Sequence, residues 1–348
     1  MNITFMIGNG FDINLGLATQ YKDFIDIYRN IQVQDDEIIQ KFKKNIINCD
    51  LPLWSNAEMA FGKQTSCIND NFSVEDYCYC HSHFCTALAE YLKGEQKKLE
   101  LSKEKLPVIA ENFSKAVNNL TIGFRAVPKG QIQSLISCYS SGISFNFIDF
   151  NYTNTLDLLC SHTNRLAGWK QHGNHNNSMG KLIHVHGTVE KDMVLGVHDE
   201  SQISNTECFK SYDTYYMAQL IKSQTDIINE ENTYKQTLQV LASSHLIYVY
   251  GMSLGDTDKF WWEKICHMLK QSGELRVILH CYEAPENELL RTDIKRFEDK
   301  QRNKLFKLGN VEKEQRGSLQ SRVHVTGTNI FKDLNNIVAQ VIDQAKAS

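Results

Sequence analysis

The chain has 348 residues, more than one typical domain, and its 42% hydrophobic content is enough to bury a sizeable core. The 37 basic and 41 acidic residues give a net charge of −4, which argues against bulk electrostatic binding of nucleic acid. The start lacks a secretory signal, and no apolar run reaches the roughly 18 residues that cross a bilayer. We therefore expect a cytoplasmic protein without a membrane partner, whose ten cysteines are reduced thiols.

The first expected element is an apolar strand over residues 2–7 that runs into a glycine turn. The turn, residues 8–12, reads Gly-Asn-Gly-Phe-Asp. Glycine lets the backbone approach a ligand closely, and a helix after such a turn points free N–H groups at an anion. The third glycine of the dinucleotide fingerprint is displaced to Gly16. The turn is thus typical of a phosphate-binding loop without being a plain dinucleotide motif.

Helical periodicity dominates the next stretch, to about residue 135. Thr19 is a candidate N-cap, and apolar residues recur at i, i+3, i+4, i+7 spacing from Tyr21 to Tyr28. Similar helical patterns cover residues 38–47, 77–101 and 109–122.

Cysteine and histidine residues gather between residues 78 and 85. They could ligate a metal, or they could be small apolar thiols and histidines packed on one helix. The chain has no Cys-x-x-Cys pair, and the segment has a helical apolar pattern. We therefore favour packing and expect no metal.

The second half of the chain alternates strands with helices. Residues 143–150 have strand length and are rich in β-branched and aromatic residues. Further strands are expected over 182–186, 193–195, 246–250, 275–281 and 323–325, with helices over 212–228, 260–269 and from 331 onward. The alternation predicts an α/β fold with a Rossmann-like, doubly wound, mostly parallel sheet. We assign residues 1–16 and 140–348 to this core, and 17–139 to a large helical insertion after the first strand.

Polar residues follow four of the expected strands, at the edge where open α/β sheets bind ligands. The segments are residues 8–12, 151–154, 184–188 and 251–258. Their glycine, asparagine, histidine, serine and aspartate residues suit ribose hydroxyls, phosphate and one acid–base group.

Each of these residues also has a purely structural explanation. Asn151 could cap the helix that follows it, and His186 could be a satisfied core histidine. Ser253 and Asp256 could form an ordinary turn and helix cap. The neighbouring Gly187 allows close approach of the backbone at His186.

The four segments resemble the bacteriophage abortive infection AbiH family, in the same order over residues 1–260. They are similar, more distantly, to the sirtuin-like NAD-binding fold. The resemblance implies an anti-phage effector that binds NAD and cleaves its N-glycosidic bond to nicotinamide. It implies two catalytic residues, His186 as general base and Asn151 at the nicotinamide ribose. The NAD contacts that we predict are Gly8, Asn9, Gly10, Asp12, Tyr152, Gly187, Gly251, Ser253 and Asp256.

Two departures from the sirtuin-like pattern matter. Thr153 stands where the sirtuin-like segment often has aspartate, and the Cys-x-x-Cys pairs of a sirtuin zinc ribbon are absent, so protein deacylation is not expected. A non-catalytic nucleotide-binding sensor or adaptor of a defence system is the alternative, and Thr153 favours it. A toxin acting on nucleic acid has only the basic stretch at 291–307 in its favour, which a solvated helix face explains better. A homo-oligomer and a phage-derived trigger are further expectations.

Overall fold

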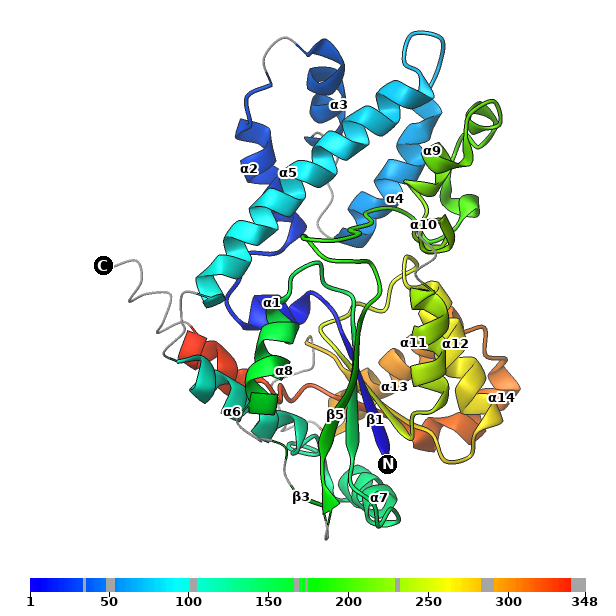
Figure 1. Ribbon diagram of the computed structural model, residues 1–348. Helices are drawn as coiled ribbons and strands as arrows, with labels where there is room; N and C mark the ends of the chain where they lie inside the picture. The colour runs from blue at the N-terminus through cyan, green and yellow to red at the C-terminus, as the bar shows by residue number, and fades with distance from the viewer. Residues whose placement is uncertain are drawn as a thin grey trace.

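A parallel β-sheet lies at the centre of the molecule (Figure 1). The computed structural model describes residues 1–33, 36–47, 54–100, 105–165, 169, 171–172, 175–228, 232–282 and 291–338. Six strands lie in the order β5-β2-β1-β6-β7-β8, and each is parallel to its neighbours. They are β1 (Asn2–Ile7), β2 (Ser144–Asp149), β5 (Ser178–His184), β6 (Leu246–Tyr250), β7 (Arg276–His280) and β8 (Val323–Thr326).

The strand order identifies the type of sheet. Numbered in chain order, the six strands read 3-2-1-4-5-6, which is the order of Rossmann-type sheets. The predicted α/β fold with a parallel sheet is thereby confirmed. The order reverses between β1 and β6, and ligands of such sheets bind beyond the carboxyl ends at this point. A separate antiparallel pair consists of β3 (Gln171–His172) and β4 (His175–Asn176).

The apolar segments of the sequence form strands where helices cover both faces of the sheet. All five residues of β6 are buried, as expected for a central parallel strand. The strand expected over 193–195 is wrong, because this segment forms no strand. Its Leu195 is instead buried in a cluster of helical side chains away from the sheet.

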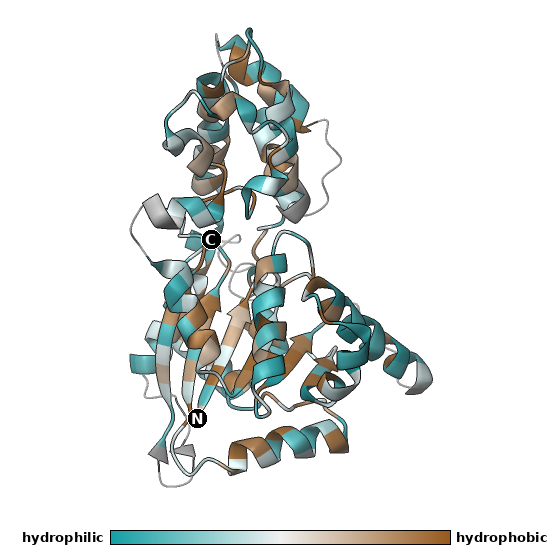
Figure 2. Ribbon diagram, turned by 90° about the vertical axis from the view of Figure 1, so that its right-hand side faces the viewer, coloured by the Kyte–Doolittle hydropathy of each residue, from teal (hydrophilic) through white to brown (hydrophobic). Residues whose placement is uncertain are grey.

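Helices cover both faces of the sheet (Figure 2, in which the strands are largely brown). One face packs against α1 (Gly10–Asn14), α6 (Leu106–Val117), α7 (Ala126–Ser137) and α8 (Thr155–Arg165). The other face packs against α11 (Thr233–Ala242), α12 (Lys259–Gln271), α13 (Arg291–Leu308) and α14 (Lys313–Leu319). This is the three-layer arrangement that the alternating sequence pattern predicts.

A helical layer stands beyond the carboxyl ends of the strands, at the top of Figure 1. It contains α2 (Tyr21–Asn30), α3 (Glu37–Ile47), α4 (Trp54–Gln64), α5 (Val74–Glu100), α9 (Thr214–Ala218) and α10 (Lys222–Ile228). Its core combines side chains of the first helices with buried side chains between Val189 and Ile221. Two separate chain segments therefore build this layer.

The predicted insertion divides between the helical layer and the sheet. Ile109 and Phe113 of α6 and Ile132 of α7 belong to the same buried cluster as Phe5 and Phe147 of the sheet. Side chains of α2 to α5 instead form the separate core of the helical layer. The domain boundaries at residues 16 and 139 stay predictions.

The cysteine–histidine segment lies on α5, and its side chains are packed as helix-core residues. Cys80 and His81 are buried, and the His81 ring lies edge-on to Phe61. Burial raises the pKa of Cys80 and of Cys85 to about 12, so both thiols stay protonated at neutral pH. These contacts are those of a packed helix core, and the expectation of no metal stays a prediction.

His81 is expected to make stability sensitive to acid. Its burial lowers the pKa to about 4, whereas the unfolded chain has a histidine pKa of about 6.5. Its contribution is therefore fully present above pH 6.5 and is lost as the pH falls towards 4. His81→Gln should remove this dependence, so the gap in unfolding free energy between wild type and variant should shrink by about 2 kcal/mol from pH 7 to pH 5. Urea unfolding at the two pH values measures it, and an unchanged gap would contradict the account.

Candidate functional site

The glycine turn after β1 interlocks with the loop after β6. Gly8 N–H donates to Tyr250 O, Gly10 N–H donates to Gly251 O, and Phe11 N–H donates to Gly8 O. The N···O distance is 2.9 Å in each of these hydrogen bonds. A Cβ atom at position 10 would lie 2.6 Å from the Gly251 Cα atom, and Gly251 itself has a φ of +70°. The glycines thus let two backbones touch at the point where the strand order reverses. Contacts from these glycines to NAD stay predictions.

The Asn9 side chain ties this turn to the start of the helical layer. It accepts a hydrogen bond from Thr19 Oγ1 (2.6 Å) and donates to the Thr19 carbonyl (2.9 Å). The residue at the N-cap of α2 is Gln20, so the expected cap at Thr19 is wrong by one position. The Thr19 hydroxyl bonds the glycine turn instead.

The helix caps expected at Asn151 and at Asp256 do not form, although Asp256 does lie in a turn, in which the Lys259 N–H donates to its carbonyl. α8 begins at Thr155, so the buried Asn151 does not cap it, and both polar atoms of the Asn151 side chain lack a hydrogen-bond partner. The N-cap of α12 is Asp258, whereas Ser253 and Asp256 are exposed on the loop before it. Asn151 therefore has unused hydrogen-bonding capacity in the interior.

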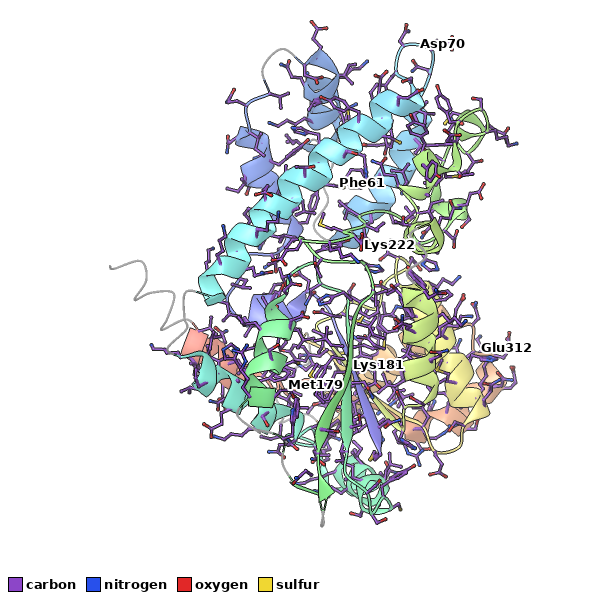
Figure 3. The ribbon with its side chains drawn as sticks, viewed as in Figure 1. Phe61, Asp70, Met179, Lys181, Lys222 and Glu312 are labelled. Atoms are coloured by element: carbon purple, nitrogen blue, oxygen red, sulfur yellow. The ribbon has the colours of Figure 1, made fainter. Side chains whose placement is uncertain are left out.

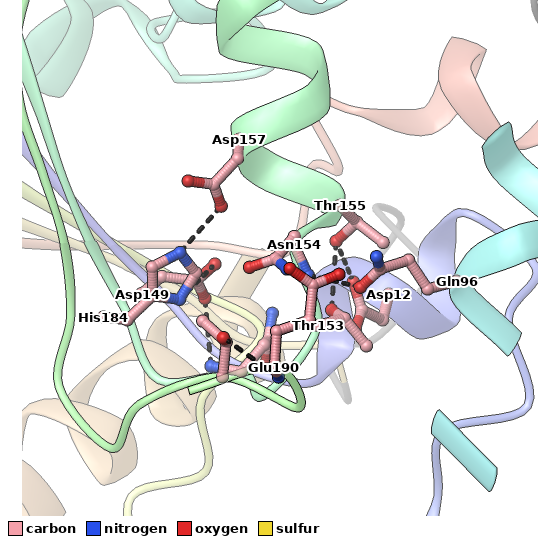
Figure 4. Close-up of polar contacts among 11 residues, drawn as sticks. Asp12, Gln96, Asp149, Thr153, Asn154, Thr155, Asp157, His184 and Glu190 are labelled. Atoms are coloured by element: carbon pink, nitrogen blue, oxygen red, sulfur yellow. Dashed lines mark hydrogen bonds and ion pairs between the residues drawn. The ribbon is translucent and has the colours of Figure 1, made fainter. Parts of the chain in front are cut away.

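Asp12 joins α1 to the loop after β2 (Figure 4). Its carboxylate accepts hydrogen bonds from Thr153 Oγ1 and from Thr155 Oγ1, with an O···O distance of 2.6 Å in each. The carboxyl is fully buried, which raises its pKa to about 6 in spite of these two bonds. An aspartate at position 153 would set two carboxylates against each other here, so Thr153 matches Asp12.

Asp12→Ala is expected to lower the unfolding free energy by about 2 kcal/mol, because two buried hydroxyl groups lose their acceptor. Asp12→Asn should cost less, since an amide can accept from one threonine and donate to the other. The pH dependence of stability distinguishes aspartate from asparagine at position 12. The folded pKa of Asp12 lies above the unfolded value, so wild type should lose stability relative to Asp12→Asn as the pH rises from about 4 to 6. Urea unfolding of the three proteins tests this, and equal stability of the two variants would contradict it.

A cavity of about 320 Å³ opens beyond the end of β5. Of the predicted site residues in the described ranges, His186 and Gly187 line it, and the remaining ones do not. The lining consists of Asn154, Asp157, His184, Val185, His186, Gly187, Thr188, Lys191, Asp192, Val194, Lys222, Thr225 and Thr233. The cavity thus lies at the β5–β2 edge of the sheet and not at the reversal between β1 and β6.

His186 is a buried histidine with an unpaired ring nitrogen. Its Nδ1 atom has no hydrogen-bond partner, and its ring lies edge-on to Phe150, with 5.6 Å between centroids. Burial, together with the charge of Lys222, holds the pKa of His186 well below 6.5. The imidazole is therefore neutral at neutral pH, and Nδ1 can accept a proton or a hydrogen bond.

His184, on the same cavity wall, lies between two carboxylates (Figure 4). Its Nε2 is 2.7 Å from Asp157 Oδ2, and its Nδ1 is 3.8 Å from Asp149 Oδ2. Burial lowers the pKa of His184, but the hydrogen bond to Asp157 and the nearby carboxylates outweigh burial and raise it to about 9. Neither His184 nor these two aspartates are among the site residues that the sequence predicted. The signal was the pair of histidines two residues apart at a strand end.

The comparisons with known proteins identify the family. No curated protein matches the chain. A family model described as "Bacteriophage abortive infection AbiH" matches residues 4–279. The chain belongs to the bacteriophage abortive infection AbiH family. Membership indicates a role in defence against bacteriophage, and the matched range includes the four polar segments.

In this AbiH-family chain, α5 reaches from the helical layer to both loops of the site. Gln96 Oε1 accepts a hydrogen bond from the Asn154 N–H (2.7 Å), next to Thr153. Glu95 Oε2 accepts one from the Ala18 N–H (2.8 Å), in the segment after α1. A single helix thereby holds the loops that follow β1 and β2.

A buried ion pair joins the helical layer to the cavity of the AbiH-family chain. Lys222 Nζ lies 2.6 Å from Glu58 Oε1, and the two side chains are only 4% and 8% exposed. Figure 3 shows Lys222 where the helical layer meets the sheet. The Tyr152 hydroxyl donates to the Val194 carbonyl (3.1 Å) and lies 3.4 Å from Glu58 Oε1. Within the described ranges, every helix falls short of the length or hydrophobicity that a membrane crossing needs.

Proposed function

We propose that this AbiH-family protein is an anti-phage effector that binds NAD and cleaves its N-glycosidic bond to nicotinamide. The observation that carries the proposal is His186, a neutral imidazole with an unpaired, buried Nδ1 atom, whose residue lines a cavity at the strand ends. The cavity volume of about 320 Å³ lies within the range of small-molecule sites. Family membership supports the defence role.

Cleavage of the N-glycosidic bond of NAD requires little acid catalysis from the protein. When the bond breaks, its electron pair moves to the nicotinamide ring nitrogen, and nicotinamide leaves as a neutral molecule. Positive charge spreads over the ribose in an oxocarbenium-like state, as in other glycosidic cleavages. A water molecule or a ribose hydroxyl then forms the new bond to the anomeric carbon and loses its proton.

His186 and Asn151 suit the two tasks that remain. Nδ1 of His186 can take the proton of the attacking hydroxyl, because the ring is neutral at neutral pH. Asn151 is buried outside the lining of the cavity with both amide atoms unpaired, and its proposed task is to orient the nucleophile once NAD is bound. The contacts of Gly8, Gly10, Gly251 and Ser253 with the rest of NAD belong to the same proposal.

A nucleotide-binding sensor without catalysis is the second candidate. It is favoured because Asn151, the second predicted catalytic residue, does not line the cavity that His186 lines. Incubating the purified protein with NAD, with and without phage lysate, and measuring free nicotinamide separates the candidates. Nicotinamide release supports the enzyme, whereas NAD binding without release supports the sensor.

A further inference from the structure

We propose that Asp149 and His184 bind a divalent metal cation at the wall of the cavity, with Asp157 as the second carboxyl of the site and the partner of the other ring nitrogen of His184. Ligand atoms of these three side chains lie within 4.8 Å of one another. They come from the end of β2, the end of β5 and the first turn of α8. The expectation of no metal came from the cysteine–histidine segment and did not consider this group.

Two facing atoms in this group have no hydrogen-bond partner. Asp149 is fully buried, and its Oδ2 atom is unpaired, as is Nδ1 of His184. The two atoms are 3.8 Å apart, too far for a hydrogen bond. Two ligand atoms at about 2.1 Å from one tetrahedral ion lie about 3.4 Å apart. The two atoms would therefore need to move only slightly closer together to share a cation. A buried, unpaired carboxylate oxygen is otherwise costly.

The second ring nitrogen of His184, Nε2, has the kind of partner that is common in metal-binding histidines. Metal-binding histidines commonly donate their second ring N–H to a carboxylate, which fixes the ring and its tautomer. Here Nε2 of His184 faces Asp157 Oδ2 at 2.7 Å, which leaves Nδ1 directed towards Asp149. The backbone N–H of Asn151 donates to Asp149 Oδ1 over 3.0 Å and orients that carboxylate in turn.

The proposed site borders the cavity. Asp149 Oδ2 and His184 Nδ1 are buried behind its wall, and because His184 and Asp157 line the cavity, the remaining coordination positions of a bound cation would be filled from that side. Mixed imidazole and carboxylate donors suit a first-row divalent ion, and on binding it the ring releases its Nδ1 proton. The alternative is that no metal binds between His184 Nδ1 and Asp149 Oδ2. In that case Nδ1 keeps its proton, and His184 is a cation between two carboxylates.

Mn²⁺ binding to the full chain tests the proposal, followed by the loss of the free-ion electron paramagnetic resonance signal. Mn²⁺ prefers oxygen and imidazole ligands, so the exposed thiols of Cys67 and Cys138 interfere little. We expect one Mn²⁺ per wild-type chain and at least about tenfold weaker binding for Asp149→Asn and His184→Gln. The control is Asp192→Asn, an exposed carboxylate of the same cavity, which should bind as wild type does.

Two results would overturn the proposal. One is no Mn²⁺ binding by wild type at millimolar concentration, which leaves the proton as the occupant. The other is equal affinity of wild type and His184→Gln, and this variant decides the matter if Asp149→Asn does not fold. Neither result depends on NAD, so the proposed cleavage can fail while the metal site stands, or the reverse.

Discussion

Replacing His186 with alanine is expected to lower the rate of nicotinamide release from NAD by about 100-fold or more. The neutral imidazole is the group on the cavity wall that we assign as the general base, and alanine cannot accept a proton in its place. Release is measured on purified protein with and without phage lysate. The control is His267→Ala, which removes an exposed histidine from α12 and should leave the rate unchanged.

The pH profile provides a second readout of the same prediction. Because burial and Lys222 hold the pKa of His186 well below 6.5, the rate should stay flat from pH 8 to 6.5 and fall only in more acidic solution. A folded His186→Ala protein with wild-type turnover would show that this histidine is not the base.

Removing the buried partner of Lys222 is expected to destabilise the protein strongly. Glu58→Ala leaves a lysine that is 4% exposed without its counter-ion, and such losses cost about 3–5 kcal/mol. The double variant Glu58→Leu with Lys222→Met removes both charges and should recover most of that free energy. Urea unfolding of wild type, single and double variants measures both effects.

The comparison of single and double variants is what decides this prediction. A loss under about 1 kcal/mol for Glu58→Ala would mean that Lys222 finds water or another carboxylate. A double variant as unstable as the single one would mean that packing of the side chains, and not their charge, joins α4 to α10.

Apolar runs in the sequence predicted the sheet well, because burial on both faces leaves a plain pattern. Residues 246–250 coincide with β6, and residues 143–150 contain β2. The short run at 193–195 failed because Leu195 is buried against helices of another chain segment. Sequence periodicity does not reveal which partner buries an apolar residue.

The candidate site was only partly predictable for a related reason. His186 follows a strand and is next to a glycine, so its position at the sheet edge could be inferred. The group of Asp149, Asp157 and His184 depends on the pairing of β2 with β5, which no local pattern encodes. Likewise, the glycines after β1 face the loop after β6, and that neighbour is known only from the strand order. The homo-oligomer and the phage-derived trigger stay predictions.

The most direct test of NAD cleavage at this cavity is to incubate the wild-type protein with NAD in ¹⁸O-labelled water, with phage lysate present. The masses of the products are then measured by mass spectrometry. Our account predicts one free nicotinamide for each NAD consumed, together with ADP-ribose that carries one ¹⁸O atom or its cyclic form without label. NAD that stays intact while bound to the protein would contradict the account.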